Sequence, residues 1–375
     1  MGTITKNLVN ELNSYFDLFC KHVKYRESED FYSILNRIYE LSYNENPLGM
    51  GKLTRNALER LARWGYRYPP MDYSILRKEI AIQNKLSDEN IIITPGSITA
   101  VYLAIHQWVN PNEKVIFSNS SLPWYNWIVL SNGSVPEIVP LFIDMNHDLE
   151  AMLKKIDKDV KAIIISNPHN PTGLYIDEKR IKRFIESIPA NVLIVIDQAY
   201  YEYQSSREIV LLNLLKKSHN ILLTRTFSKL HGMAGLRVGY GLANKELINL
   251  LRAKWIAFTP SINAPSVFAS YHALQDKEHI EKSRKFNFEV KNKIYELADK
   301  YQVEYLKSES NFVALNVVNS KVIEKYFIDH DFQLTPGYVF GYPEWIRISF
   351  IREKKRLYKQ LDYVFKEVVK LKYKT

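Results

Sequence analysis

The sequence predicts an α/β protein in which a large, doubly wound and mostly parallel sheet is followed by a smaller α+β domain. Short runs rich in isoleucine and valine alternate with amphipathic stretches through the middle of the chain, and several runs lack polar residues at alternate positions. Strands buried on both faces of a parallel sheet have this pattern, and their alternation with helices is typical of doubly wound folds. A length of 375 residues exceeds what one ordinary core needs and favours a second domain.

The expected elements follow the chain in order. The residues before about 43 read as helices, in "KNLVNELNSYFDLFCKHV" and "FYSILNRIYELSY". Strands of the large sheet are predicted at 90–94, 114–118, 161–166, 192–197 and 220–224, with helices between them at 97–109, 177–188 and 245–255. A helical stretch at 266–300, strands near 312–317 and 345–350, and a terminal helix complete the chain. We therefore expect a helical segment at 1–43, a large domain at 44–275 and a small domain at 276–375.

The net charge is +10, and much of the excess lies in the last segment, "IREKKRLYKQLDYVFKEVVKLKYKT". Apolar residues recur there at helical spacing, so we interpret it as an amphipathic helix with a solvated basic face. No helix-turn-helix, zinc-finger or RNA-recognition signature is present, and we expect neither a nucleic-acid partner nor a metal. The single cysteine, Cys20, cannot form an internal disulfide, and no signal peptide, myristoylation motif or membrane-length apolar run is evident. These features favour a cytoplasmic protein without a membrane partner.

Polar and ionisable groups follow the predicted strands at the point where each strand ends. In open α/β sheets, ligands bind outside the carboxyl ends of the strands, so these groups are candidates for one site. They are Gly96, Ser97 and Ile98 after the first strand, Asn170 after the third, Asp197 and Tyr200 after the fourth, and Thr226, Ser228, Lys229 and Arg237 after the fifth.

This constellation suits pyridoxal 5′-phosphate. A glycine and a hydroxyl at a helix amino terminus form an anion site from backbone N–H groups, and further hydroxyls with Arg237 would complete a phosphate cup. Lys229 supplies an amine for a Schiff base, and Asp197 would pair with the pyridinium nitrogen. Tyr200 and Asn170 would bond the ring hydroxyl. Any one of these groups alone would more often be a helix cap, a solvated lysine or a turn residue, but their placement at successive strand ends favours a shared site.

At these residues the chain resembles the fold type I pyridoxal-phosphate enzymes of the class I/II aminotransferase family. The stretches "SNPHNPTG", "DQAY" and "TFSKLHGMAGLRVGYG" carry this resemblance, in the family's order. "SYNENPLGMG" and "YRYPPMDYSILRKEIA" resemble the histidinol-phosphate aminotransferase branch. The resemblance extends from Tyr43 to about Phe350 and implies the fold type I architecture, the cofactor and an L-amino acid substrate.

The resemblance also implies a role for individual residues. Lys229 would hold the cofactor and move the substrate's α-proton, and Tyr125 would stack on the ring. Arg347, in "WIRISF", matches the arginine that binds the substrate α-carboxylate. Asn46 would line the substrate pocket. Tyr68 matches a tyrosine that reaches the phosphate from the neighbouring subunit, so a homodimer is implied.

The sequence departs from the family's pattern in three places. The turn after the first strand reads "PGSIT", where that branch usually has acidic residues. Histidinol-phosphate enzymes usually carry a second arginine for the substrate phosphate shortly before the carboxylate one, whereas "FQLTPGYVFG" contains none. The family's common "DEAY" is "DQAY" in this chain.

An aminotransferase is the leading prediction, and four alternatives stay open at this point. A lyase or cyclodehydratase, similar to capreomycidine or enduracididine synthases, would use the same cofactor, as would an amino-acid decarboxylase. A basic nucleic-acid-binding or scaffold protein that kept a dead enzyme fold is opposed by the intact Lys229 and Asp197. A nicotinamide dehydrogenase is opposed by the absence of a G-x-G-x-x-G stretch after a first strand.

Overall fold

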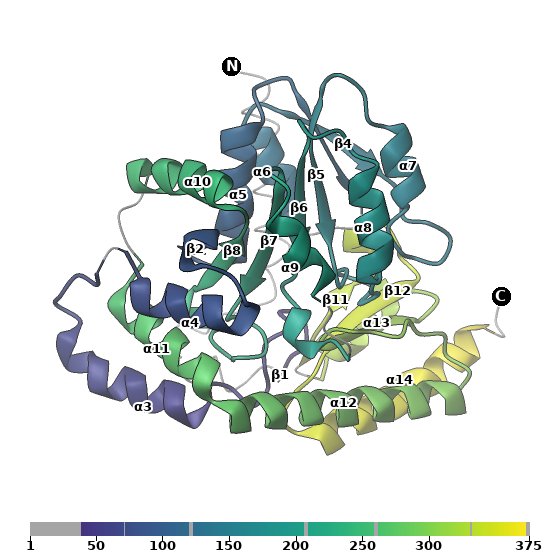
Figure 1. The fold of residues 1–375 in the computed structure, drawn as a ribbon. Coiled ribbons are helices and arrows are strands. Elements are labelled where there is room, and N and C mark those ends of the chain that lie inside the picture. Colours follow the sequence, from purple (N-terminus) through teal and green to yellow (C-terminus); the bar gives the residue numbers. More distant parts are fainter. Residues whose placement is uncertain are drawn as a thin grey trace.

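A seven-stranded sheet with helices on both faces forms the centre of the structure (Figure 1). The structure is a computed structural model and describes residues 39–70, 72–119, 123–205, 209–258, 262–330 and 332–372. The strand order is β2-β8-β7-β6-β5-β3-β4. Strand β8 is antiparallel to both of its neighbours, and the remaining neighbouring pairs are parallel. The predicted doubly wound, mostly parallel sheet is confirmed.

The strands of the large sheet are short and almost wholly buried, apart from β4 at the edge. All five predicted strands are present, and β4 and β8 were not predicted. The bounds are β2 (Ile91–Thr94), β3 (Lys114–Ser118), β4 (Val135–Val139), β5 (Val160–Ser166), β6 (Leu193–Asp197), β7 (Ile221–Thr226) and β8 (Gly239–Leu242).

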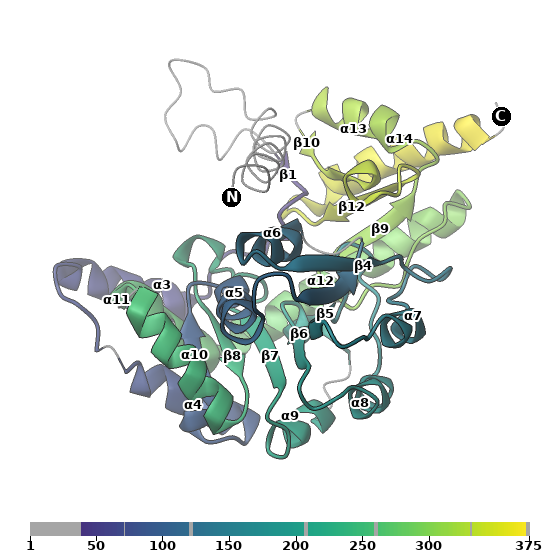
Figure 2. The same cartoon turned by 90° about the horizontal axis from the view of Figure 1, so that it is seen from above.

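Helices cover the two faces of this sheet, with α5 and α6 on one side and α8 and α9 on the other (Figure 2). Several begin at an Asp or Asn whose side chain accepts a backbone N–H bond of the first turn. In the described part of the chain, no helix combines the length and apolarity that crossing a bilayer requires. The helices are α3 (Lys52–Leu61), α4 (Ser74–Asn84), α5 (Ser97–Trp108), α6 (Pro123–Ser131), α7 (Leu149–Lys154), α8 (Glu178–Glu186), α9 (Val210–Leu215), α10 (Lys245–Phe258), α11 (Ala264–Gln275), α12 (Lys277–Lys300), α13 (Ser320–Ile328) and α14 (Lys354–Lys372).

A second, smaller sheet lies in the carboxyl-terminal part of the chain. Its strand order is β11-β12-β9, and both pairings are antiparallel. A separate parallel pair joins β1 to β10, so the segment that enters from the amino-terminal side is tied to this part of the molecule. The bounds are β1 (Tyr39–Glu40), β9 (Phe312–Asn316), β10 (Phe332–Gln333), β11 (Thr335–Pro336) and β12 (Trp345–Ser349).

The buried apolar side chains form two main clusters. One extends from Tyr73 to Leu274 and contains the large sheet, whereas the other combines Leu41 with residues from Val290 to Val368. Apolar burial drives each cluster to pack separately. The two clusters support the predicted division near 275, which stays a proposal.

Two of the predicted elements are wrong in detail. The helix predicted to continue to residue 43 is replaced at Tyr39–Glu40 by β1, because pairing with β10 holds this short stretch extended. The helical stretch predicted at 266–300 is two helices, because Asp276 ends α11 and its side chain caps α12 by accepting from His279 N. The predicted helices before residue 39 lie outside the described residues.

Candidate active site

The carboxyl ends of three neighbouring strands bring the predicted groups together. In the register of the sheet, Ser166 on β5 is opposite Asp197 on β6, and Asp197 is opposite Thr224 on β7. Asp197 is 2% exposed and accepts hydrogen bonds from the Tyr125 hydroxyl at 2.7 Å and from Thr224 Oγ1 at 3.0 Å. Burial raises the pKa of Asp197. A cationic ring nitrogen beside this carboxylate would compensate for that burial.

Lys229 lies three residues beyond β7, close to this carboxylate. Its Nζ donates to the Tyr43 carbonyl at 2.8 Å and lies 5.6 Å from the centre of the Tyr200 ring. Burial, followed by the positive charge of Arg347, lowers the pKa of Lys229 from 10.5 to about 8. A lysine in this state is a neutral amine for a large part of the time near pH 8, as a nucleophile or a base requires.

Arg347, on β12 of the small sheet, reaches the same place. Its guanidinium donates to Asn170 Oδ1 at 2.5 Å, to Thr335 Oγ1 at 2.8 Å and to the Ser42 carbonyl. Asn170 in turn donates to the Tyr200 hydroxyl at 3.2 Å. A bidentate cation is thus fixed in a buried site by neutral acceptors, an arrangement that suits a carboxylate ligand.

An anion cradle lies at the amino terminus of α5. Gly96 precedes the helix with a φ of 76°, which favours glycine, and no side chain caps the first turn that contains Ser97 and Ile98. A Cβ on Gly96 would lie 2.6 Å from Arg237 Nη2, so a larger residue would be strained by the backbone and would push this guanidinium aside. The Arg237 guanidinium also contacts Ser228 Oγ at 3.4 Å.

The residues present therefore fit pyridoxal 5′-phosphate. Ser228 Oγ accepts a bond from Thr226 at 3.0 Å, so two hydroxyls, one guanidinium and the helix terminus converge where a phosphate would bind. Lys229 directly follows Ser228 of this cradle and would bind the aldehyde of the cofactor, and Asp197 would pair with the ring nitrogen.

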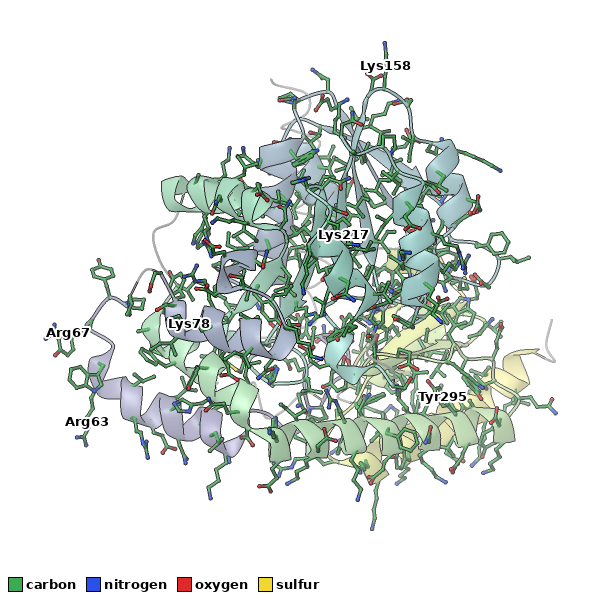
Figure 3. All side chains as sticks on the ribbon, in the orientation of Figure 1. Arg63, Arg67, Lys78, Lys158, Lys217 and Tyr295 are labelled. Atoms are coloured by element: carbon green, nitrogen blue, oxygen red, sulfur yellow. The ribbon has the colours of Figure 1, made fainter. Side chains whose placement is uncertain are left out.

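Three predicted residues have other contacts in the structure. The Tyr125 hydroxyl bonds Asp197, and its stacking on the ring stays a prediction. Asn46 donates to the Leu230 carbonyl at 2.6 Å and to Ser283 Oγ at 2.9 Å, so it holds the loop after Lys229, and its place in the substrate pocket also stays a prediction. Tyr68 is 91% exposed and follows Arg67, which lies on the projecting segment between α3 and α4 (Figure 3).

The structure adds Asn44, which the sequence reasoning missed. Its backbone φ is 55°, and its side-chain amide donates to the Tyr200 hydroxyl at 2.9 Å. Its carbonyl accepts from Asn311 at 2.9 Å. The position of this asparagine in "SYNENP" was a usable signal, because Asn is enriched in the left-handed region and often marks a functional turn.

The family model described as "Aminotransferase class I and II" matches residues 37–360. The chain is 31% identical over 317 residues to a histidinol-phosphate aminotransferase of Caldicellulosiruptor saccharolyticus, covering 84% of this chain and 88% of that one. It is also 31% identical to histidinol-phosphate aminotransferase 1 of Bacillus cereus, covering 84% and 85%. Its fold is similar to the crystal structure of histidinol-phosphate aminotransferase from Sinorhizobium meliloti in complex with pyridoxal-5′-phosphate, with a TM-score of 0.81, 24% identity and coverage of 89% and 92%.

Proposed function

This chain belongs to the class I and II aminotransferase family, and we propose that it moves the amino group of an L-amino acid that carries no phosphate, with Lys229 as its central catalytic residue. The coarser statement is established by the comparisons: the protein is a pyridoxal-phosphate-dependent aminotransferase. The observation that carries the residue assignment is the position of Lys229 Nζ, held by the Tyr43 carbonyl in the same site as buried Asp197 and Arg347.

Pyridoxal phosphate supplies an electron sink that makes loss of the α-proton accessible. In our proposal, Arg347 binds the substrate carboxylate through its fork and orients the α-carbon. Lys229 receives the α-proton as a neutral amine and returns it. Asp197 keeps a negative charge beside the ring nitrogen, and Ser228 with Arg237 holds the phosphate.

The proposed substrate differs from the one that the relatives' names give. In the stretch "FQLTPGYVFG", β11 places Thr335 directly opposite Arg347, and the Thr335 hydroxyl accepts a bond from that guanidinium. A neutral, short side chain there offers no charge for a substrate phosphate. Discrimination by a missing charged partner is large, because a buried unpaired phosphate loses several hydrogen bonds.

Turnover without an amino acceptor tests the reaction. Purified enzyme with bound cofactor receives a panel of L-amino acids and no keto acid, and the keto-acid product is quantified per site. We expect one equivalent and then no further product, and no product from Lys229→Ala. Continued product formation would indicate a lyase or cyclase instead.

The phosphate question is tested with a matched pair of substrates, L-histidinol phosphate and L-histidinol. We expect the phosphate to give no gain in kcat/KM. A preference for the phosphate above about tenfold, or 1.4 kcal/mol, would overturn the substrate proposal and leave the aminotransferase assignment unchanged.

We also propose a homodimer in which Tyr68 completes the partner's phosphate cradle. Tyr68 is accompanied on its projecting segment by Trp64 and Tyr66, which are also exposed, and a cluster of exposed aromatic side chains is typical of interfaces. A cytoplasmic location is part of the same proposal, supported by the single cysteine.

Mixed dimers test this arrangement. Lys229→Ala and Tyr68→Ala chains are each expected to be nearly inactive, but an equal mixture after subunit exchange would contain about one quarter intact sites, since each mixed dimer has one. Recovery of about a quarter of the activity is expected. No recovery, with mixed dimers present by mass spectrometry, would contradict sharing of Tyr68.

A further inference from the structure

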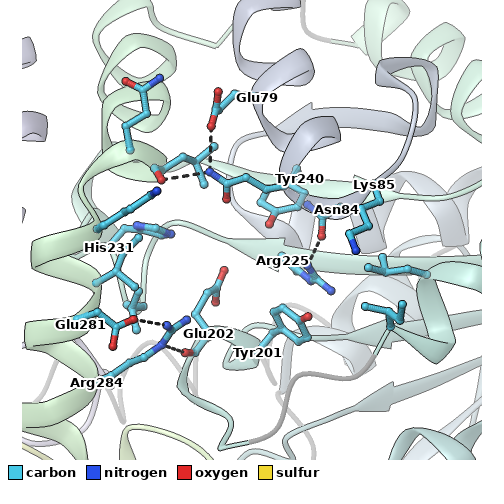
Figure 4. A pocket seen from close by; sticks show the side chains of 18 of the residues that line it. Glu79, Asn84, Lys85, Tyr201, Glu202, Arg225, His231, Tyr240, Glu281 and Arg284 are labelled. Carbon is cyan, nitrogen blue, oxygen red and sulfur yellow. Dashed lines mark hydrogen bonds and ion pairs between the residues drawn. The ribbon is translucent and has the colours of Figure 1, made fainter.

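A cavity of about 720 Å³ is lined in part by Arg225 of β7, and Figure 4 shows the side chains around it. Its walls come from the end of α4, the segment after Asp197, α9 and the start of α12, and none of the residues assigned to the active site lines it. A cavity of this size is in the range that holds small-molecule ligands. Successive residues of a strand face opposite sides, so Thr224 and Thr226 face the active site and Arg225 faces the cavity.

Arg225 is buried with neutral partners only. It is 2% exposed, donates to Gln198 Oε1 at 2.9 Å and to Asn84 Oδ1 at 2.6 Å, and its guanidinium carbon lies 3.5 Å from the centre of the Tyr201 ring. The Tyr240 hydroxyl is a further partner. In the described part of the chain, Arg225 makes no ion pair.

A buried charge without a counter-charge is unfavourable, so this guanidinium is poised to receive an anion. An arginine has five N–H donors, and the three polar partners use three of them, which leaves about two for a ligand. N–H groups of a guanidinium that lack a protein partner can bind the oxygens of a carboxylate.

His231 is a second residue of the cavity wall with an atom that lacks a hydrogen-bond partner. It is 3% exposed, its ring lies in the cavity wall, and its Nδ1 atom is buried without a hydrogen-bond partner (Figure 4). The other ring nitrogen bonds the Ala273 carbonyl, and burial lowers the pKa of His231 to about 3, so the ring is neutral. Nδ1 is therefore an acceptor, and it calls for a ligand with an N–H or O–H donor.

We propose that this cavity binds a small organic acid whose carboxylate pairs with Arg225 and whose hydroxyl or amino group donates to His231. The cavity lining contains five positive groups, Lys85, Lys216, Arg225, Lys277 and Arg284, and three negative ones, Glu79, Glu202 and Glu281. The net charge of +2 favours anions, and the three lysines are exposed where an anion would enter. The proposed ligand would contact the two segments that also carry active-site residues. Gln198 follows Asp197 directly, and His231 is two residues after Lys229. The site is therefore distinct from the active site but in contact with the same loops.

The test compares ligand binding with and without a carboxylate placed next to Arg225 by substitution. L-Malate, which carries both carboxylate and hydroxyl groups, is the probe, and its Kd is measured by calorimetry on the cofactor-loaded enzyme. All chains also carry Arg347→Gln, so that binding to the candidate active site is suppressed. In Gln198→Glu, the new carboxylate would occupy Arg225, and we expect malate affinity to fall at least tenfold.

The matched control is Gln275→Glu, which adds the same charge at an exposed residue that lines the cavity without contacting Arg225. It is expected to change the Kd less than threefold. Equal losses in the two variants would show a general charge effect and overturn the assignment to Arg225. Absence of malate binding in the parent, or tighter binding of inorganic phosphate than of malate, would also overturn the proposal.

The contact with His231 is tested separately with His231→Phe. This variant should lose affinity for malate but not for succinate, which lacks the hydroxyl group.

Discussion

The two faces of β7 differ in the partners that their charged side chains have. On the active-site face, Thr224 donates a hydrogen bond to the Asp197 carboxylate, and Arg347 lies close enough to Lys229 for its positive charge to lower the pKa of that lysine. On the other face, the Arg225 guanidinium has amide, hydroxyl and aromatic partners but no carboxylate. Strand β7 therefore borders a site in which charges of both signs interact and a cavity in which the Arg225 guanidinium makes no ion pair with the described residues, although carboxylates also line that cavity. The candidate active site is suited to proton transfer, and the cavity at Arg225 is suited to binding an anion.

The sharpest test of the chemical face is Lys229→Ala. We expect kcat to fall by at least about 10³-fold, because the variant loses both the amine that binds the cofactor and the group that moves the proton. Initial rates with the preferred amino acid and keto acid measure the effect. The control is Lys217→Ala, which removes an exposed lysine between α9 and β7 and should leave activity unchanged. Residual activity above about one tenth would remove Lys229 from the proposed role.

The lowered pKa of Lys229 predicts unusual reactivity of its amine in enzyme freed of cofactor. The pKa of about 8 means that half of the amine is neutral at pH 8, and labelling should increase as the pH rises through this value. At pH 8 an ordinary lysine is almost wholly protonated, so the neutral fraction of the Lys229 amine should be on the order of 100-fold larger than that of an ordinary lysine. Peptide mass spectrometry after acetic anhydride treatment over pH 6–11 would measure the labelling of Lys229. A labelling midpoint near the ordinary lysine value of about 10.4 would contradict the electrostatic picture of the site.

The substitution Arg347→Lys keeps the positive charge but removes the pair of N–H donors with which a guanidinium binds both oxygens of a carboxylate. We expect kcat/KM to fall about 10- to 100-fold, which corresponds to the loss of one charge-assisted hydrogen bond, mainly through KM. Arg352→Lys, at an exposed position just after β12, is the control and should be neutral. An unchanged KM for amino acids in Arg347→Lys would mean that the substrate carboxylate binds elsewhere.

The other face is tested through stability. Gln198→Glu should raise the free energy of unfolding at pH 7 by about 1–3 kcal/mol, because it gives a buried guanidinium the partner it lacks. The pairing would depress the carboxyl pKa in the folded state, so the gain should be present above the unfolded pKa of about 4.3 and be lost as the pH falls below it. Urea unfolding at pH 7 and pH 3.5 measures this, and Gln275→Glu should show no gain. A destabilised Gln198→Glu would argue that the neutral surroundings of Arg225 are already balanced.

The sequence predicts the strands that are continuous apolar runs and misses those that are not. Lys114–Ser118 is predicted with its observed bounds, because every residue after the lysine is buried. Strand β4 contains Pro136 and Glu137 at a partly exposed edge, and β8 reads "GYGL", so neither has the expected apolar pattern. The break at Asp276 lacks a glycine or proline and is set by a side-chain cap.

For the site, side-chain motifs were predictable and main-chain contacts were not. The groups at the strand ends, from Asp197 to Arg237, are brought together as proposed from the order of the strands. The carbonyls of Ser42 and Tyr43, which hold Arg347 and Lys229, have no signature in sequence because every residue has a carbonyl. Pairing of β1 with β10 places them, and this depends on the tertiary fold.

Helix α12 has a mechanical consequence. Its 24 residues form a rod about 36 Å long. Near one end, Ser283 contacts Asn46 and Arg284 lines the rear cavity, whereas farther along Val290, Ile294 and Ala298 are packed into the carboxyl-terminal cluster. The helix therefore connects the wall of the cavity to the carboxyl-terminal cluster. A tilt of 10° about its first residue would displace its last residue by about 6 Å, which is several times the tolerance of a hydrogen bond.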